Sequence, residues 1–142
     1  MIIKQVSVFL ENKSGRLSEV TQILGETGIN ISAFTIADTS DFGILRLIVS
    51  DPERTREILK NNNFSVQTTE VVLVKSPNKP GGLAEMLQIL NAKGVFIEYM
   101  YAFSMSKEDA IVVIRPTSLE KCIEILQNHK NDFLFTDDDN QF

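Results

Sequence analysis

Two segments of the chain, 66 residues apart, are near copies of each other. The first covers residues 12–31 and the second residues 78–97, and ten of the twenty aligned positions are identical. Each copy has an Asn-Lys-x-Gly loop, then apolar residues at helical spacing, and then a glycine that ends the helix. A repeat of fixed period indicates that one supersecondary unit is built twice, and it constrains the fold more than any single residue does.

The pattern around the two copies predicts the same order of elements in both halves. Strands are indicated by short runs rich in β-branched residues, and helix starts by Asp51-Pro52 and by the capping-box pattern of residues 117–120. The first half has expected strands at 2–10, 30–37, 42–49 and 64–68, with helices at 15–28 and 52–61. The second half has expected strands at 71–75, 95–104, 110–115 and 133–135, with helices at 82–93 and 117–129.

Each half therefore has the order βαββαβ, which is the ferredoxin-like motif. We predict an α+β protein of two ferredoxin-like repeats, each with an antiparallel sheet that carries its helices on one face. The expected domains are residues 1–69 and 70–142, and no Gly-, Pro- or Ser-rich linker separates them. The strands at 44–49 and 110–114 are apolar on both faces, so we expect both of their faces to be covered.

Composition excludes several classes of partner. The chain has 142 residues, with 14 Lys and Arg against 19 Asp and Glu, so its net charge is −5. An acidic chain without a basic run is a poor nucleic-acid binder, and no apolar run approaches the roughly 18–20 residues of a membrane span. The chain begins with a strand-like pattern instead of a signal-peptide layout, and its single cysteine excludes an internal disulfide. We therefore expect a cytoplasmic protein that binds neither nucleic acid nor membrane.

Residues that carry catalytic chemistry are scarce. His129 is the single histidine and falls near a helix end, where a surface position is expected, and Cys122 is flanked by apolar residues typical of a core. A zinc or iron–sulfur site needs several Cys or His ligands, which this chain lacks. The acidic run at 137–139 lacks the alternate spacing of a calcium loop. We expect no catalytic residue, no metal and no cofactor.

The repeated loops are the strongest candidate for a binding site. Residues 12–15 and 78–82 lead into helix N-termini, where unpaired backbone N–H groups and the helix dipole favour an anion such as a carboxylate. An asparagine amide can accept from an ammonium and donate to a carboxylate, which suits a zwitterion. Asn and Gly are also ordinary turn residues, so a purely structural interpretation of the loops stays open.

These motifs, taken together, resemble the ACT domain family over nearly the whole chain, in two copies. The first copy has Asn-x-x-Gly-x-Leu at 12–17, a helix over 18–24 and Gly-Ile-Asn-Ile at 28–31. The second copy has Asn-Lys-Pro-Gly-Gly-Leu at 78–83 and Gly-Val-Phe-Ile at 94–97. The resemblance implies a regulatory module that senses a small molecule, usually an amino acid. It also implies that ACT domains pair and bind the ligand at their interface.

The resemblance also implies which residues bind the ligand. In the serine-sensing branch of the family, a loop Asn and the Asn of a Gly-Val-Asn-Ile motif hold the amino acid, and these match Asn12 and Asn30. The second copy keeps Asn78 but has Phe96 in place of Asn30, and Leu10 and Ser76 stand where that branch has a histidine, so serine specificity is not carried over. Leu10 and Phe96 offer apolar walls, so an amino acid with a larger side chain than serine is expected. The full predicted set is Leu10, Asn12, Ser14, Gly15, Arg16, Leu17, Asn30, Ile31, Ser76, Asn78, Gly81, Gly82, Leu83, Phe96 and Ile97.

The preferred interpretation is a non-catalytic regulatory protein that binds an amino acid or related metabolite, forms a homodimer and acts on a partner enzyme. One alternative is a dedicated regulatory subunit of an amino-acid biosynthetic enzyme such as acetolactate synthase. Two others are an enzyme with a ferredoxin-like fold and a dimerisation module without a ligand.

Overall fold

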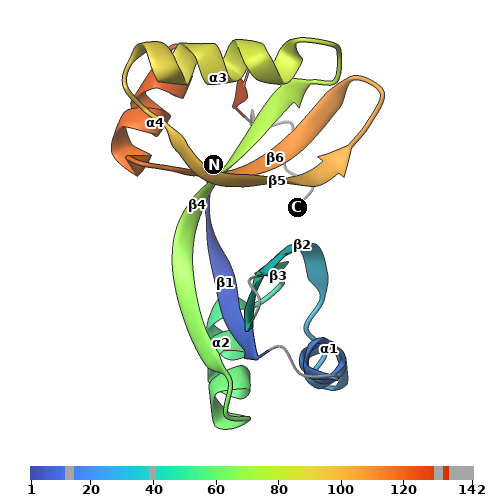
Figure 1. Ribbon diagram of the computed structural model, residues 1–142. Helices are drawn as coiled ribbons and strands as arrows, with labels where there is room; N and C mark the ends of the chain where they lie inside the picture. The colour runs from blue at the N-terminus through green and yellow to red at the C-terminus, as the bar shows by residue number, and fades with distance from the viewer. Residues whose placement is uncertain (12–14, 39–40, 130–132, 135–142) are drawn as a thin grey trace. The chain divides into compact units, whose positions relative to one another are not determined.

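The computed structural model describes residues 1–11, 15–38, 41–129 and 133–134 (Figure 1). The elements in chain order are β1 (Ile2–Glu11), α1 (Arg16–Glu26), β2 (Ile31–Asp38), β3 (Phe42–Val49), α2 (Pro52–Asn61), β4 (Ser65–Pro77), α3 (Gly82–Ala92), β5 (Ile97–Met105), β6 (Asp109–Pro116) and α4 (Leu119–Gln127). The order of strands and helices follows the one expected from the repeat, except at β4 and at residues 133–135.

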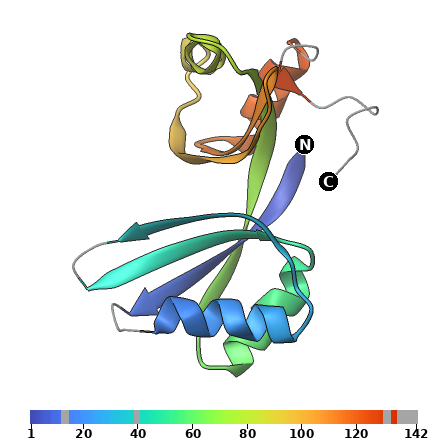
Figure 2. The same cartoon turned by 90° about the vertical axis from the view of Figure 1, so that its right-hand side faces the viewer.

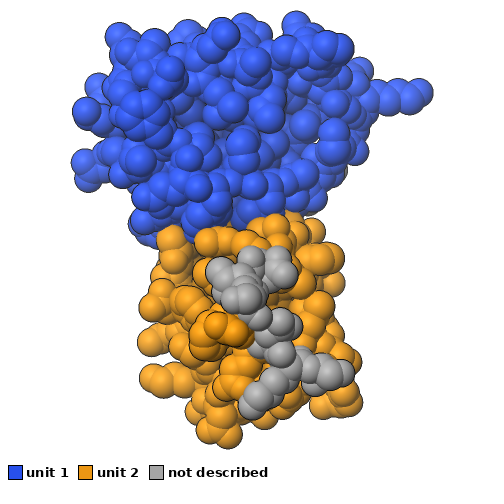
Figure 3. Space-filling model, in the orientation of Figure 1, with its two compact units in different colours: residues 1–3, 70–142 blue, residues 4–69 orange. Residues whose placement is uncertain are grey.

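The chain forms two compact units, coloured separately in Figure 3. The N-terminal unit comprises residues 4–69, and the C-terminal unit comprises residues 70–142 together with residues 1–3. The two strands predicted at 64–68 and 71–75 are in fact one strand, β4, and this strand contributes residues to both units.

The N-terminal unit is a sheet with the strand order β2-β3-β1-β4, and helices α1 and α2 lie together on one of its faces (Figure 2). Strand β3 is antiparallel to both β1 and β2, and Val8 of β1 lies opposite Leu45 of β3. Alternate residues of β1 point toward the helices because successive side chains of a strand point to opposite faces. The core beneath α1 and α2 is formed by Val6, Val8, Leu10, Val20, Leu24, Ile29, Leu45, Leu47, Val49, Leu59 and Phe64.

The C-terminal unit repeats this arrangement with the strand order β4-β6-β5 and with α3 and α4 on one face (Figure 1). Strand β6 is antiparallel to both β4 and β5, and Val74 lies opposite Val112. Its core is formed by Val72, Val74, Met86, Leu90, Val95, Val112, Ile114, Cys122, Leu126, Phe133 and Leu134. The predicted α+β class, with two antiparallel ACT-type repeats that carry helices on one face, is confirmed.

The strand predicted at residues 133–135 is wrong in its described part. Phe133 is helical, its N–H donates to the His129 carbonyl oxygen at 3.2 Å, and its ring is buried in the core. The start of the chain lies beside β4 instead: the Leu73 N–H donates to the Met1 carbonyl oxygen at 2.7 Å, and the Met1 amino group donates to the Leu73 carbonyl oxygen at 3.2 Å. Core packing of an apolar ring thus outweighs the strand pattern at the end of the repeat.

The starts of α2 and α4 show how closely the two units match. The Asp51 side chain accepts from the Arg54 N–H at 3.1 Å and caps α2, as predicted. In α4 the cap is Ser118, which accepts from the Lys121 N–H. Thr117 is not the cap that the capping-box pattern suggests, because its hydroxyl accepts from the Phe96 N–H at 3.2 Å.

Two glycines give a direct test of this local geometry. A Cβ at Gly25 of α1 would meet open space, whereas a Cβ at Gly82 of α3 would lie 2.2 Å from the Pro77 carbonyl oxygen. We predict that Gly25→Ala raises the free energy of unfolding by about 0.5–1 kcal/mol, because alanine favours the helix. Gly82→Ala should lower the free energy of unfolding by about 1–3 kcal/mol, because the backbone must move to relieve the clash with the Pro77 carbonyl oxygen. Urea denaturation measures both changes, and a shift of the same sign in the two variants would contradict the prediction.

Candidate functional site

Both repeated loops end in a glycine with a left-handed backbone. Gly15 has φ of 87° and Gly81 has φ of 84°, a conformation that residues with a Cβ rarely adopt. Each glycine carbonyl accepts the first helical hydrogen bond, from Glu19 at 2.9 Å and from Glu85 at 3.0 Å. The glycines shared by the two copies are therefore required to turn the chain from the loop into the helix.

The second loop is tied to the turn between β5 and β6. The Asn78 side-chain amide donates to the Ser106 carbonyl oxygen, and the Asn78 N–H donates to the Glu108 carbonyl oxygen at 2.8 Å. Gly82 lies against the Pro77 carbonyl oxygen, where only a glycine fits. The amide donor of Asn78 thus holds the loop in place, which is the structural role that turn residues commonly have.

A cavity of about 280 Å³ opens beside this loop, and we call it the Ser76 cavity. It includes three of the residues predicted to bind a ligand, namely Ser76, Asn78 and Leu83. Strands β5 and β6 supply six of its eleven lining residues, and most of these six are apolar. The other lining residues are Pro77, Lys79, Met100, Tyr101, Ala102, Met105, Ala110 and Val112.

Ser76 is the most unusual residue of this cavity. Its side chain is 2% exposed, and its hydroxyl has no hydrogen-bond partner among the described residues. A buried polar group without a partner costs about 1–3 kcal/mol, so such groups are rare in folded proteins. Ser76 thus combines a buried hydroxyl that has no partner among the described residues with a place in the lining of the cavity.

The matching position of the first repeat is different. Leu10 lies opposite Gly43 as Ser76 lies opposite Ala110, so the two residues occupy the same place in the two sheets. Leu10 is 6% exposed and belongs to the core of the N-terminal unit. The apolar side chain fills space in the first repeat, where the second repeat has a hydroxyl and a cavity.

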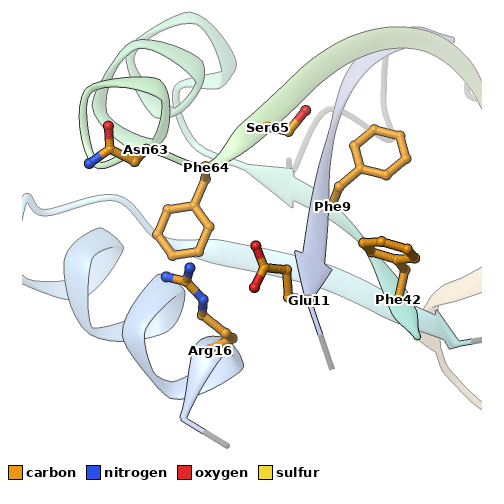
Figure 4. A pocket seen from close by; sticks show the side chains of 7 residues that line it. All are labelled: Phe9, Glu11, Arg16, Phe42, Asn63, Phe64 and Ser65. Carbon is orange, nitrogen blue, oxygen red and sulfur yellow. The ribbon is translucent and has the colours of Figure 1, made fainter. Parts of the chain in front are cut away.

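The N-terminal unit has its own cavity of about 180 Å³, which we call the Arg16 cavity (Figure 4). Of the predicted ligand-binding residues it contains Arg16 alone. The Arg16 guanidinium lies over the Phe64 ring at 5.2 Å from the ring centre, and it donates to Glu19 at 3.1 Å. The other lining residues are Phe9, Glu11, Phe42, Asn63 and Ser65.

Asn30 and Phe96 are structural equivalents, but neither lines either cavity. The Asn30 N–H donates to the Ser50 hydroxyl at 3.0 Å, and the Phe96 N–H donates to the Thr117 hydroxyl at 3.2 Å. Asn30 is exposed, and 58% of the Phe96 surface is exposed. Their backbones therefore fix the start of β2 and of β5, while their side chains stay at the surface.

The remaining predicted residues divide into three groups. Asn12 and Ser14 lie outside the described residues. Ile31 and Ile97 pack against the two cores, which gives them a structural role. Leu17 lies outside both cavities and is 41% exposed, the same exposed fraction as Leu83.

Sequence reasoning missed most of the residues that line the two cavities. Met100 and Met105 of β5 reach the Ser76 cavity through the pairing of β5 with β6 and of β6 with β4. Asn63 and Ser65 reach the Arg16 cavity from the turn between α2 and β4. A long-range register of this kind leaves no local sequence signal, although the repeat itself indicated where the loops would lie.

The two residues singled out for catalytic chemistry, Cys122 and His129, lie within α4 and just after it. Burial raises the pKa of the Cys122 thiol to about 11, so this cysteine is protonated near neutral pH and is a poor nucleophile. The His129 ring lies 6.2 Å from the Phe133 ring, at the end of α4.

Within the described ranges, no cluster of three or more His, Cys, Asp or Glu could hold a metal ion. No helix in the described part of the chain is long and apolar enough to cross a membrane.

The chain belongs to the ACT domain pair family, whose model matches residues 1–141. The crystal structure of protein BT0572 from Bacteroides thetaiotaomicron is similar, with a TM-score of 0.89 and 53% identity over 100% of this chain and 98% of that chain. The resemblance to ACT domains that the loop and helix motifs indicated is therefore confirmed.

Two further similar proteins are named as subunits of enzymes. The regulatory subunit of aspartate kinase from Thermus thermophilus, in its ligand-free form, shares the fold with a TM-score of 0.63 and 16% identity, over 90% of this chain and 96% of that chain. The acetolactate synthase small subunit of Buchnera aphidicola is 26% identical over 148 residues, covering 89% of this chain and 87% of that protein. Both similarities agree with membership of the ACT domain pair family.

The unpaired hydroxyl of Ser76 gives a prediction for the ligand-free protein. We predict that Ser76→Ala raises the free energy of unfolding by about 1 kcal/mol, because it removes a buried polar group that has no partner among the described residues. Urea denaturation without added metabolites measures the change. Ser18→Ala, at an exposed position of α1, is the matched control and should leave the value unchanged within about 0.5 kcal/mol. A destabilised Ser76→Ala would show that the hydroxyl is already paired.

Proposed function

We propose that this protein is a non-catalytic regulator that binds a free amino acid in the Ser76 cavity and transmits the bound state to another chain. The buried, unpaired hydroxyl of Ser76 carries the proposal, because a ligand atom inside the cavity would satisfy it. Membership of the ACT domain pair family and the similarity to a regulatory subunit of aspartate kinase support the regulatory role.

The lining of the cavity supports an amino acid with an apolar side chain. Ser76 and Asn78 offer hydrogen bonds to the polar end of a ligand, and the Lys79 ammonium is a partner for a carboxylate. Met100 and Met105 provide an adaptable apolar wall for the side chain. A volume of about 280 Å³ lies just below the roughly 300 Å³ at which ligand sites begin, and so it favours a free amino acid over a nucleotide.

Binding would act by shifting a population of conformations. A ligand that binds one arrangement better than another stabilises it by the difference in binding free energy. The loop is hydrogen-bonded to the β5–β6 turn through Asn78, so a ligand in the cavity would stiffen both segments together. A partner chain that contacts this turn could then distinguish the bound state from the free state.

A thermal-shift screen of the twenty amino acids tests the ligand. A ligand at one hundred times its Kd stabilises the fold by about 2.7 kcal/mol, which corresponds to a rise in Tm of roughly 5–15 °C. We predict such a rise with at least one apolar amino acid, and a loss of affinity of roughly tenfold in Ser76→Ala. Ser18→Ala should bind like the unmodified protein. An unchanged Tm with every amino acid would favour a dimerisation module.

A second candidate function is a subunit of a larger biosynthetic enzyme, as the match to an acetolactate synthase small subunit suggests.

We also propose that the chain pairs with itself, since Phe34 on the edge strand β2 is 64% exposed and a second copy could cover it.

Affinity purification followed by analytical ultracentrifugation separates these outcomes. If the chain is such a subunit, it should recover one catalytic chain in a stoichiometric amount. A monodisperse homodimer without any other chain would contradict the subunit and support self-pairing.

A further inference from the structure

We propose that Met105 is a site of reversible oxidation and that its sulfoxide makes the Ser76 cavity less able to take apolar groups. The proposal combines the exposure of this methionine, its place in the lining of the cavity and a bulge that turns it there. The oxidation does not depend on the function proposed for the Ser76 cavity, whereas its effect on a bound amino acid rests on that function.

The four methionines of the chain differ in their access to solvent. Met105 is 65% exposed and Met1 is 38% exposed, whereas Met100 is partly buried and Met86 is fully buried in the core. A dissolved oxidant must reach the thioether sulfur, so the rate of oxidation follows exposure. We therefore expect Met105 to be oxidised first and Met86 last.

A bulge in β5 turns Met105 toward the cavity. Successive residues of a strand point to opposite faces, so two residues three positions apart, such as Ala102 and Met105, normally point to opposite faces. The register with β6 shifts between Ala102 and Ser104, so that Ala102 lies opposite Val112 and Met105 lies opposite Ala110. Val112 and Ala110 share one face, and the bulge therefore brings Met105 onto the face that lines the cavity.

Met105 and Ser76 lie in one row across the sheet. Ser76 of β4 pairs with Ala110 of β6, and Ala110 pairs with Met105 of β5, so the three side chains point to the same face. The alanine between them contributes only a methyl group. The long side chain of Met105 is therefore the main apolar group in the row that contains the buried Ser76 hydroxyl.

The first repeat lacks this arrangement. Its matching row consists of Leu10, Gly43 and Asp38, and β2 has no register shift between residues 33 and 38. A core leucine and a carboxylate thus stand where the second repeat has a hydroxyl and a thioether. The oxidation site is a feature of the second repeat, in which the bulge occurs.

The backbone next to Met105 is fixed, while its side chain is flexible. The Ser106 N–H donates to the Asp109 carbonyl oxygen at 2.8 Å, which closes the turn between β5 and β6. The Asn78 N–H donates to the Glu108 carbonyl oxygen, also at 2.8 Å, and ties this turn to the loop beside the cavity. A methionine has three rotatable side-chain bonds, so the thioether can adapt to a group in the cavity or turn toward solvent.

The chemical step is the transfer of an oxygen atom from a peroxide. The Met105 sulfur attacks one oxygen of hydrogen peroxide, an S–O bond forms and the O–O bond breaks. The departing hydroxide takes the proton of the transferred oxygen and leaves as water, so the sulfur loses two electrons and the peroxide gains two. Methionine sulfoxide reductases reverse the step with a dithiol, which becomes a disulfide while the oxygen leaves as water.

The sulfoxide makes part of the cavity wall polar. Its oxygen is a hydrogen-bond acceptor that water solvates, and an apolar group that enters the cavity would have to displace this water without replacing its hydrogen bonds. We therefore expect apolar groups to bind less tightly after oxidation, and to bind normally again after reduction.

Nuclear magnetic resonance of the full chain labelled with 13C at its methionine methyl groups tests the oxidation. Variants with leucine at single methionines assign the four signals. In dilute hydrogen peroxide, the Met105 signal should convert to the sulfoxide at least about tenfold faster than the Met86 signal, and it should return with a methionine sulfoxide reductase and a dithiol. Conversion of Met1 or Met100 before Met105, or of Met86 at the same rate, would contradict the proposal.

Isobutanol, a small uncharged molecule with an apolar end, tests the effect on the cavity. It should shift the Met100 methyl signal saturably in the reduced chain, and bind at least about threefold more weakly once Met105 is oxidised. Failure of isobutanol to bind the reduced chain, or equal affinity after oxidation, would overturn the proposal. If no amino acid changes the Tm, the function proposed above fails while these two measurements keep their meaning.

Matched variants assign the effect to Met105. Met105→Leu keeps an apolar side chain of similar size but has no sulfur, so isobutanol binding should survive peroxide treatment. Met105→Gln places a polar group there and should weaken binding without any peroxide. Ile36→Gln, at a 43% exposed position of the edge strand β2 in the other unit, is the control and should leave the affinity unchanged. Loss of binding in peroxide-treated Met105→Leu would assign the effect to another methionine and refute the proposal.

Discussion

The burial of the strands β1 and β4 under their helices is the interaction on which the rest of the structure depends. Val6 and Val8 of β1 and Val72 and Val74 of β4 are all fully buried, and each such side chain contributes about 1.5–3 kcal/mol. These strands leave the cores at Glu11 and Pro77, where the repeated loops begin. Both cavities lie at these strand ends, so the packing of each core positions the residues that could bind a ligand.

Much of the fold could be predicted because the repeat and the local signals agree. The glycines at 15 and 81, the Asp51 cap and the apolar spacing of the helices each specify a local geometry that the structure has. The errors occur where distant packing decides: Phe133 packs into the core instead of forming a strand, and the separate strands expected at 64–68 and 71–75 are one strand, β4.

Only the part of the candidate site whose residues are close together in the sequence could be predicted. Ser76, Asn78 and Leu83 lie within eight residues and were identifiable from the loop motif, whereas Met100 and Met105 arrive through two strand pairings that no local pattern encodes. Comparison of the repeats also indicated that the two loops are not equivalent. In the structure the two loops differ because Leu10 is part of the core of the N-terminal unit, whereas Ser76 borders a cavity.

The reciprocal hydrogen bonds between Met1 and Leu73 have a consequence for dissecting the molecule. A fragment that starts at residue 70 would carry the second loop and its cavity but would lose the backbone groups that pair with Leu73. An unpaired apolar edge of this kind recruits other strands, and the isolated fragment would therefore tend to aggregate. A fragment of the C-terminal repeat that keeps its native strand pairing must therefore include residues 1–3 beside β4 as well as residues 70–142.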